Sequence, residues 1–188
     1  METGPLAVAL LPFARVDTTA GITIRRITEH DGPALRDLRL RSIADSPAAF
    51  GQPLAEASAR PDVEWLRSAR QSAHGDHRTW LIAEGSGQTL GLVQGRKRRP
   101  ATLLLFSMWV DPSARRLGVG RMLIDALEAW ASGWDAVETI LWVMANNRAA
   151  IEFYRDLGFE PLGRGEDADS GARFGAIAMR RRIHSPTG

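Results

Sequence analysis

The chain is predicted to fold as an α/β domain of the α+β kind, built on a mixed sheet. Apolar runs of strand length alternate with stretches of helical spacing, in the order strand, two helices, three strands, helix, strand, helix, two strands. Within this order, an apolar run at 103–110, an amphipathic stretch at 118–132 and a second apolar run at 137–144 are typical of a right-handed parallel crossover. The 188 residues, 44% of them hydrophobic, suffice for one substantial core.

The domain is expected to span residues 21–183. Residues 1–20 show no sustained period and contain Gly4, Pro5 and Pro12, so they are predicted to be a poorly ordered extension. Residues 184–188 are predicted to be a short tail.

The N-terminal part is predicted to hold one strand and two helices. Ile22 and Ile24 mark the strand, and the first helix follows Asp31, a plausible cap, with Pro33 in its first turn. The polar stretch 46–53 should break this helix, and the second helix is expected near 62–73.

The middle and C-terminal parts are predicted to be rich in strands. Gly85–Gly87 and the basic stretch 96–100 are expected turns, and Pro112 cannot continue a strand. The expected strands are 79–84, 90–95, 103–110, 137–144, 159–162 and 174–179; the expected helices are 118–132 and 147–157, and 163–171 reads as a polar, acidic loop.

Composition excludes several functions. The chain has no cysteine, which rules out disulfides and a thiol nucleophile, and its four histidines lack a clear third ligand, so no metal is expected. The sequence pI is about 9.9, yet the basic residues are scattered apart from 96–99 and 180–182, which argues against a nucleic-acid interface. No apolar stretch is long enough to span a bilayer and no signal peptide is expected, so the predicted location is cytoplasmic.

The segment 115–121 carries the strongest chemical signal. Gly118 and Gly120 lie between a predicted strand and a predicted helix, where bare backbone amides can approach a bound group closely. The helix N-terminus and three arginines (Arg115, Arg116 and Arg121) add positive charge. The turn is therefore predicted to hold a phosphate or diphosphate, as found in a nucleotide or coenzyme A.

Three motifs in order resemble the GNAT superfamily of acyl-CoA-dependent N-acyltransferases. They are the strand ending Trp109-Val-Asp-Pro112 with the Arg-x-x-Gly-x-Gly turn after it, Asn146 before a short helix, and Tyr154-x-x-Leu-Gly-Phe159. The resemblance covers residues 101–162, and a weaker match lies at 38–51. The resemblance to this family implies a mostly antiparallel sheet with one parallel, splayed strand pair, flanked by about four helices.

The resemblance also implies acetyl-CoA as co-substrate and a role for each site residue. Main-chain groups of Met108, Trp109 and Val110 would pair with the pantetheine arm, and a bulge near Trp109 would aim an N–H at the thioester carbonyl. Asn146 would contact the cofactor, and Tyr154 would protonate the departing thiolate. The diphosphate would be held by Arg115, Arg116, Leu117, Gly118, Val119, Gly120 and Arg121.

Alternative roles remain open for some of these residues. Asn146 is also a candidate cap of the helix at 147, and Trp109 and Trp142 are core residues by default. Leu104 and Leu141 stand where many family members place a carboxylate base, so the base is another side chain or a water chain, or the amine arrives already neutral. The candidates are Glu84, Asp45, His74 and His77.

The predicted function is transfer of acetyl from acetyl-CoA to a primary amine by direct attack. The acceptor, a small molecule or a peptide, is not identified; segments 44–65 and 163–171 are expected to shape its site. Dimers are common in this family, so a homodimer is one expectation for the assembly. Two alternatives are a non-catalytic acyl-CoA sensor on the same fold, and a basic nucleic-acid-binding protein.

Overall fold

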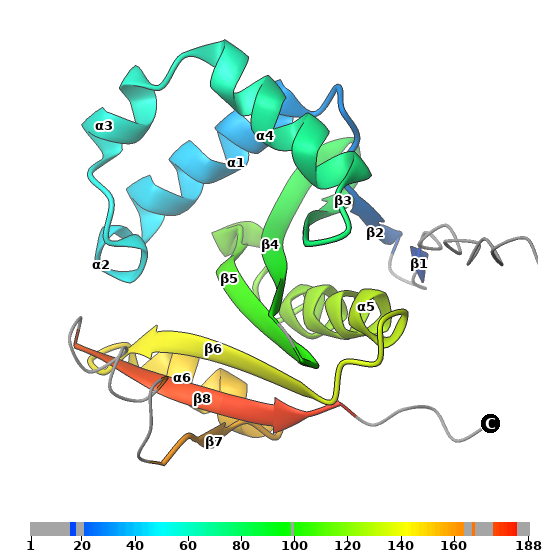
Figure 1. Ribbon diagram of the computed structural model, residues 1–188. Coiled ribbons are helices and arrows are strands. Elements are labelled where there is room, and N and C mark those ends of the chain that lie inside the picture. Colours follow the sequence, from blue (N-terminus) through cyan, green and yellow to red (C-terminus); the bar gives the residue numbers. More distant parts are fainter. Residues whose placement is uncertain (1–15, 18–20, 99, 164–166, 168–174, 184–188) are drawn as a thin grey trace, which may run out of the picture.

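One mixed sheet forms the centre of the molecule in this computed structural model, which describes residues 16–17, 21–98, 100–163, 167 and 175–183 (Figure 1). Its eight strands lie in the order β1-β2-β3-β4-β5-β6-β8-β7. They are β1 (Val16–Asp17), β2 (Ile22–Arg26), β3 (Arg78–Gly85), β4 (Gln88–Arg98), β5 (Thr102–Val110), β6 (Glu138–Met144), β7 (Glu160–Pro161) and β8 (Ala176–Arg182). Only β5 and β6 pair in parallel. This confirms the predicted mixed sheet with one parallel pair joined by a helix.

The helices of the described residues are α1 (Gly32–Asp45), α2 (Pro47–Phe50), α3 (Leu54–Ala59), α4 (Asp62–His74), α5 (Val119–Ser132) and α6 (Arg148–Asp156), with a 3₁₀ turn at Pro112–Ala114. The prediction of about four helices missed the two short ones, α2 and α3. Pro47 is tolerated because it occupies the first turn of α2, and Gly51, with φ +60°, ends that helix. The stretch 46–53 thus redirects the chain through a short helix.

Pairing decides where the last long strand lies. β8 was predicted at 174–179 and is observed from Ala176 to Arg182. Arg180, Arg181 and Arg182 stay in the strand because they pair with the first three residues of β6. At the other end of the chain, Val16–Asp17 pair with β2 as β1. The rest of segment 1–20, and residues 184–188, lie outside the described residues.

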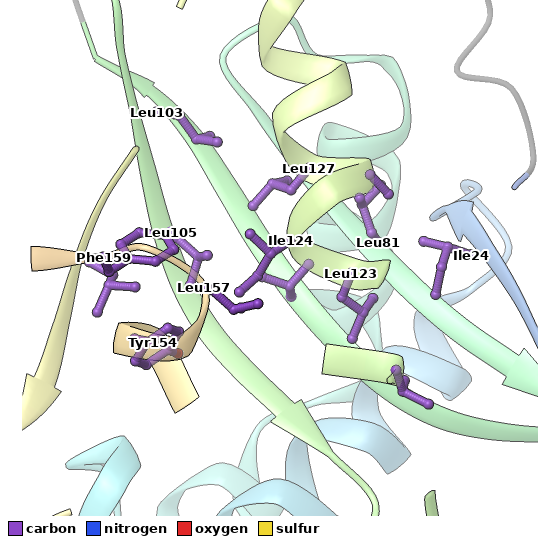
Figure 2. Packing of buried hydrophobic residues seen from close by; sticks show 14 of the residues in the cluster. Ile24, Leu81, Leu103, Leu105, Leu123, Ile124, Leu127, Tyr154, Leu157 and Phe159 are labelled. Atoms are coloured by element: carbon purple, nitrogen blue, oxygen red, sulfur yellow. The ribbon is translucent and has the colours of Figure 1, made fainter. Parts of the chain in front are cut away.

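Two apolar layers cover the two faces of the sheet. α5 packs against one face with the fully buried Leu123, Ile124 and Leu127 (Figure 2). On the opposite face α1 and α4 cover strands β2–β4 through Leu35, Leu38 and Trp65. Each such side chain contributes roughly 1.5–3 kcal/mol by leaving water. These layers pack against strands β3 to β5 from both faces of the sheet.

Candidate active site

The parallel strands β5 and β6 pair along only part of their length. Their register runs from Thr102–Glu138 to Leu105–Leu141 and stops there, although β5 continues to Val110 and β6 to Met144. Figure 1 shows them close together at one end and apart at the other. The splayed strand pair that the resemblance implies is therefore present, and it leaves an unpaired edge on each strand.

A β-bulge lies on the unpaired part of β5. Ser107 and Met108 together stand opposite Val93 of β4, and Ser107 has a φ of +51°. The extra residue reverses the alternation of the strand. Leu103 and Leu105 face the α5 layer before the bulge; after it Met108 and Val110 face that layer, while Trp109 packs into the α1–α4 layer. The bulge lies next to Trp109, as predicted.

The hydrogen-bonding direction of β5 beyond the bulge follows from its neighbour. The amide of Asp111 donates to the carbonyl of Leu90 at 2.8 Å, so Asp111 faces β4. Because main-chain groups alternate along a strand, those of Val110 face the open side. The backbones of β4 and β5 lie close together at Gly91 of β4. A Cβ at this position would lie 2.8 Å from the Trp109 carbonyl oxygen. A glycine inside a predicted strand was a signal for this feature that the sequence analysis did not use.

The glycine turn has an open, positively charged surface. Gly118 has a φ of +80° and precedes α5, and a Cβ added there would meet no atom within 4 Å. No side chain caps α5, so its first amides are not satisfied by the helix or by a cap. Arg116 and Arg121 are exposed, and neither forms an ion pair within the described part of the chain. Leu117 is also exposed, at 59%.

Gly120 and Val119 have a different role, because both are buried in the structure. A Cβ at Gly120 would lie 2.8 Å from Phe153 Cζ of α6 and 3.3 Å from Met108 Cε. A side chain at position 120 would therefore displace the packing of α6 and β5 against the start of α5. The sequence pattern alone does not distinguish this role from close approach to a ligand.

The Arg115 guanidinium forms a hydrogen bond and an ion pair within the protein. Its Nε donates to the Val110 carbonyl at 3.0 Å, and its Nη2 forms an ion pair with Asp45 at the end of α1. The same Asp45 oxygen accepts from Trp109 Nε1 at 2.9 Å and from Ser46 Oγ at 2.7 Å. Burial by itself would raise the pKa of Asp45, but the hydrogen bonds from Ser46, Trp109 and Arg115 outweigh it and lower that pKa.

A second ion pair ties α1 to the end of β5. Arg41 Nη2 lies 2.5 Å from Asp111 Oδ2 and its guanidinium lies over the Trp109 ring at 5.3 Å. Asp111 also accepts from the Ser113 side chain and amide. These bonds, first from Ser113 and then from Arg41, lower the pKa of Asp111 to about 2. The carboxylate is thus ionised at neutral pH and holds the turn that leads to Gly118.

Tyr154 lies on α6 within the apolar layer. Its ring packs against Phe153 and Phe159, with centroids 5.3 and 5.6 Å away. The residue is 7% exposed, and Figure 2 shows it with Phe159 among the buried residues of the cluster. Burial raises the pKa of the Tyr154 hydroxyl above its ordinary value, so the phenol keeps its proton at neutral pH. The same side chain therefore serves the core and presents a protonated phenol on α6.

Asn146 does not cap α6, contrary to the alternative considered from the sequence. Asn147 is the cap, and its Oδ1 accepts from the Ala150 amide at 3.1 Å. The side chain of Asn146 is exposed at the end of the loop that follows β6. It is therefore available for another contact.

The four candidate bases separate by position. Glu84 pairs with Arg25 at 2.7 Å, and His74 lies 3.4 Å from Glu29. His77 stands just before β3, whose neighbours are β2 and β4. Asp45 alone contacts a residue next to the bulge. Of the four candidates, Asp45 is therefore the one that lies beside the open edge of β5.

The expected acceptor region lies beside the open ends of β5 and β6. α2 contacts β6, and in Figure 1 it lies beyond the open end of the strand pair. Phe106 and Trp142 stack with centroids 5.7 Å apart, one residue beyond the last paired positions, and Trp142 Nε1 donates to the Asp167 carbonyl. Most of the predicted loop 163–171 lies outside the described residues.

Two further kinds of feature are absent from the described residues. None of their helices is long and apolar enough to cross a membrane. They contain no group of three His, Cys, Asp or Glu residues that could hold a metal ion.

The chain belongs to the GNAT acetyltransferase family. The family model described as "Acetyltransferase (GNAT) family" matches residues 41–159, more than half of the chain. That range includes the bulge, the glycine turn and Tyr154.

Curated relatives carry acetyltransferase names. The mycothiol acetyltransferase of Thermomonospora curvata is 29% identical over 151 residues, which cover 79% of this chain and 47% of that protein. The ribosomal protein bS18-alanine N-acetyltransferase of Salmonella typhimurium is 44% identical over 55 residues, covering 29% of this chain and 37% of that protein. The chain thus spans about half or less of the length of the relatives it matches.

Solved structures share the fold at low sequence identity. The PaiA N-acetyltransferase of Thermoplasma acidophilum, in complex with coenzyme A, has a TM-score of 0.69 and 18% identity, covering 86% of this chain and 98% of that one. The GNAT domain of S. lividans PAT has a TM-score of 0.68 and 18% identity, and the match covers 90% of this chain and 96% of that one.

Proposed function

We propose that the protein transfers the acetyl group of acetyl-CoA directly to a primary amine, without a covalent enzyme intermediate. The observation that carries the proposal is the divergence of β5 from β6 after Leu105 and Leu141, with the bulge on the edge it exposes. An extended ligand arm can add to such an edge as an extra strand does. The family membership agrees with this chemistry.

The glycine turn fits the diphosphate of coenzyme A. The open space at Gly118, the uncapped start of α5 and the unpaired Arg116 and Arg121 all favour a bound anion. Arg115 contributes its main chain there, since its guanidinium is held by Val110 and Asp45. Asn146, exposed beside β6, and the open-side groups of Met108 and Val110 would contact the arm.

Acetyl-CoA, when bound, supplies a thioester whose carbonyl carbon is open to attack by an amine. The new C–N bond forms as the C–S bond breaks; the amine loses one proton and the departing sulfur gains one. A main-chain N–H on the open side of β5 would donate to the carbonyl oxygen as negative charge develops there. Tyr154, kept protonated by its burial, would donate to the departing sulfur.

Asp45 is better suited to hold charge than to accept a proton. Its lowered pKa keeps it ionised, and Arg115, Trp109 and Ser46 share one of its oxygens. Its role in the proposed reaction is to position Trp109 and Arg115 beside the edge of β5. The amine would then arrive neutral or lose its proton to water.

Calorimetry tests whether the protein binds acetyl-CoA. Release of the CoA thiol with a panel of primary amines tests whether it transfers the acetyl group. We expect measurable binding and amine-dependent thiol release. The double variant Arg116→Gln/Arg121→Gln should bind acetyl-CoA more weakly, with Arg155→Gln, an exposed arginine of α6, as control. Absence of binding at millimolar acetyl-CoA would refute the assignment.

A non-catalytic acyl-CoA sensor is the second candidate. Its support is that Leu104 and Leu141 occupy the positions where many family members carry a carboxylate, and that Leu141 is 1% exposed. It predicts acetyl-CoA binding without thiol release for any amine. The two assays together therefore separate it from an enzyme.

A further inference from the structure

Three buried donors between α1 and α4 have no hydrogen-bond partner among the residues that the structure describes. They are Arg36 Nε, Arg39 Nη1 and Trp65 Nε1. Buried polar atoms are nearly always paired, because an unpaired one destabilises the folded state. Arg36 Nε has an ion-pair contact with Asp62, whereas Arg39 has no carboxylate partner among the described residues, which indicates a missing anionic partner for Arg39.

The donors belong to one neighbourhood. Arg36 and Arg39 are three residues apart on α1 and so lie on one side of that helix. α1 packs against α4, which carries Trp65. Arg60, before α4, stacks on the Trp65 ring at 4.3 Å. Arg39 stacks on the Phe50 ring of α2 at 4.9 Å. We call Arg36, Arg39, Arg60 and Trp65 the arginine cluster.

The arginine cluster carries one positive charge in excess. Arg60 pairs with Glu64 at 3.0 Å, and Arg36 Nε lies 3.4 Å from Asp62. Arg39 has no carboxylate partner among the described residues. Burial, together with the nearby Arg60, lowers the pKa of Arg39 to about 10, so it remains charged at neutral pH. An unpaired, half-buried guanidinium is costly without an anion to bind.

We propose that the arginine cluster binds a carboxylate carried by the amine acceptor, with Arg39 as the principal contact. This inference rests on the proposed acetyl transfer and names the class of its acceptor. A guanidinium offers two parallel N–H donors that match a carboxylate. The acceptor is therefore an amine that also bears an acidic group, as an amino acid does.

The position of Arg39 agrees with this use. Arg39 precedes Asp45 by six residues on α1, which is about 9 Å along the helix axis. Asp45 bonds Trp109, which adjoins Val110 on the open edge of β5. Phe50, under the Arg39 guanidinium, belongs to α2, which contacts β6. An acceptor whose amine lies several bonds from its carboxylate can thus reach from Arg39 toward the strand edge.

Matched acceptors test the proposal. Thiol release is compared for a panel of amino acids and their carboxamides, with wild type, Arg39→Gln and Arg67→Gln. Arg67 is an exposed arginine of α4 outside the cluster. We expect wild type and Arg67→Gln to prefer the free acids by about tenfold or more in kcat/KM. Arg39→Gln should bring the ratio near one. Equal or greater turnover of the carboxamides by wild type would overturn the proposal.

A binding measurement keeps this test separate from the test of acetyl transfer. N-acetyl amino acids and their carboxamides are titrated in the presence of CoA, and the shift in Tm is followed. We expect the free acids to raise the Tm of wild type but not of Arg39→Gln. Without added acid, Arg39→Gln should be at least as stable as wild type, because it removes an unpaired buried charge. A loss of stability in that variant, or equal shifts with acid and carboxamide, would assign Arg39 a structural role. If acetyl-CoA binds but no amine is acetylated, the proposed function fails while this measurement still decides the carboxylate site.

Discussion

Asp45 Oδ2 accepts a hydrogen bond of 2.9 Å from Trp109 Nε1, and these residues lie 64 positions apart in the sequence. The bond joins the end of α1 to β5 just after the bulge. Because Arg115 pairs with the same carboxylate, Asp45 also connects the turn that begins the glycine segment. One carboxylate thereby holds together the strand edge and the approach to the proposed diphosphate site.

Replacing Asp45 by alanine should destabilise the fold and disturb the site. The buried Trp109 indole N–H and Arg115 would lose their acceptor, which costs about 1–3 kcal/mol. Asp45→Asn retains an acceptor oxygen but not the charge, so its loss should be smaller. Urea unfolding measures both free energies. The exposed Asp156→Ala should change little. An Asp45→Ala protein as stable as wild type would show that this carboxylate is dispensable.

Tyr154→Phe separates the phenol from the packing of its ring. The ring contacts with Phe153 and Phe159 are kept, so the free energy of unfolding should change little. We expect kcat to fall roughly 10- to 1,000-fold, with acetyl-CoA affinity retained. Steady-state thiol release and calorimetry measure the two quantities. An unchanged kcat would remove Tyr154 from the mechanism.

The two glycines of the turn should respond differently to substitution. Gly118→Val places a side chain in open space where the diphosphate is proposed to bind, so acetyl-CoA affinity should fall. Gly120→Ala would clash with Phe153 and should lower Tm instead. Gly87→Ala is a control for Gly118, because it has a φ of +74° and open space around it. Its strain costs about 1 kcal/mol without touching the site. Equal acetyl-CoA affinity in Gly118→Val and Gly87→Ala would contradict the phosphate assignment.

Asp111 should make stability depend on pH at the acid end. Its folded pKa is about 2, below the value of about 3.9 in an unfolded chain. Its contribution is therefore complete above the unfolded pKa and is lost as the pH falls from about 4 toward 2. Asp111→Asn should be about 1 kcal/mol less stable at pH 7, after allowance for solvent screening. Unfolding curves between pH 2.5 and 7 should show the two proteins converging at low pH. A constant difference across that range would exclude an electrostatic origin.

The sequence by itself determined the order of strands and helices, the parallel crossover and the glycine turn. These features follow from signals within single segments. The signals are the period of the side chains, a proline that cannot continue a strand, and a glycine before a helix. The resemblance carried by residues 101–162 added the splayed pair and the position of the bulge. Short helices such as α2 escaped prediction because four residues are too few to show a period.

Only the tertiary structure decided which side chains meet. Asp45, Trp109 and Arg115 form one hydrogen-bonded group. Arg39 lies over the Phe50 ring, and within the described part of the chain its Nη1 has no hydrogen-bond partner. Gly120 is constrained by Phe153, which lies on another helix. Such relationships depend on how distant segments pack, and no pattern within one segment encodes them. Hydrogen bonds and ion pairs act over a few ångströms, so residues far apart in sequence acquire them only when folding brings them together.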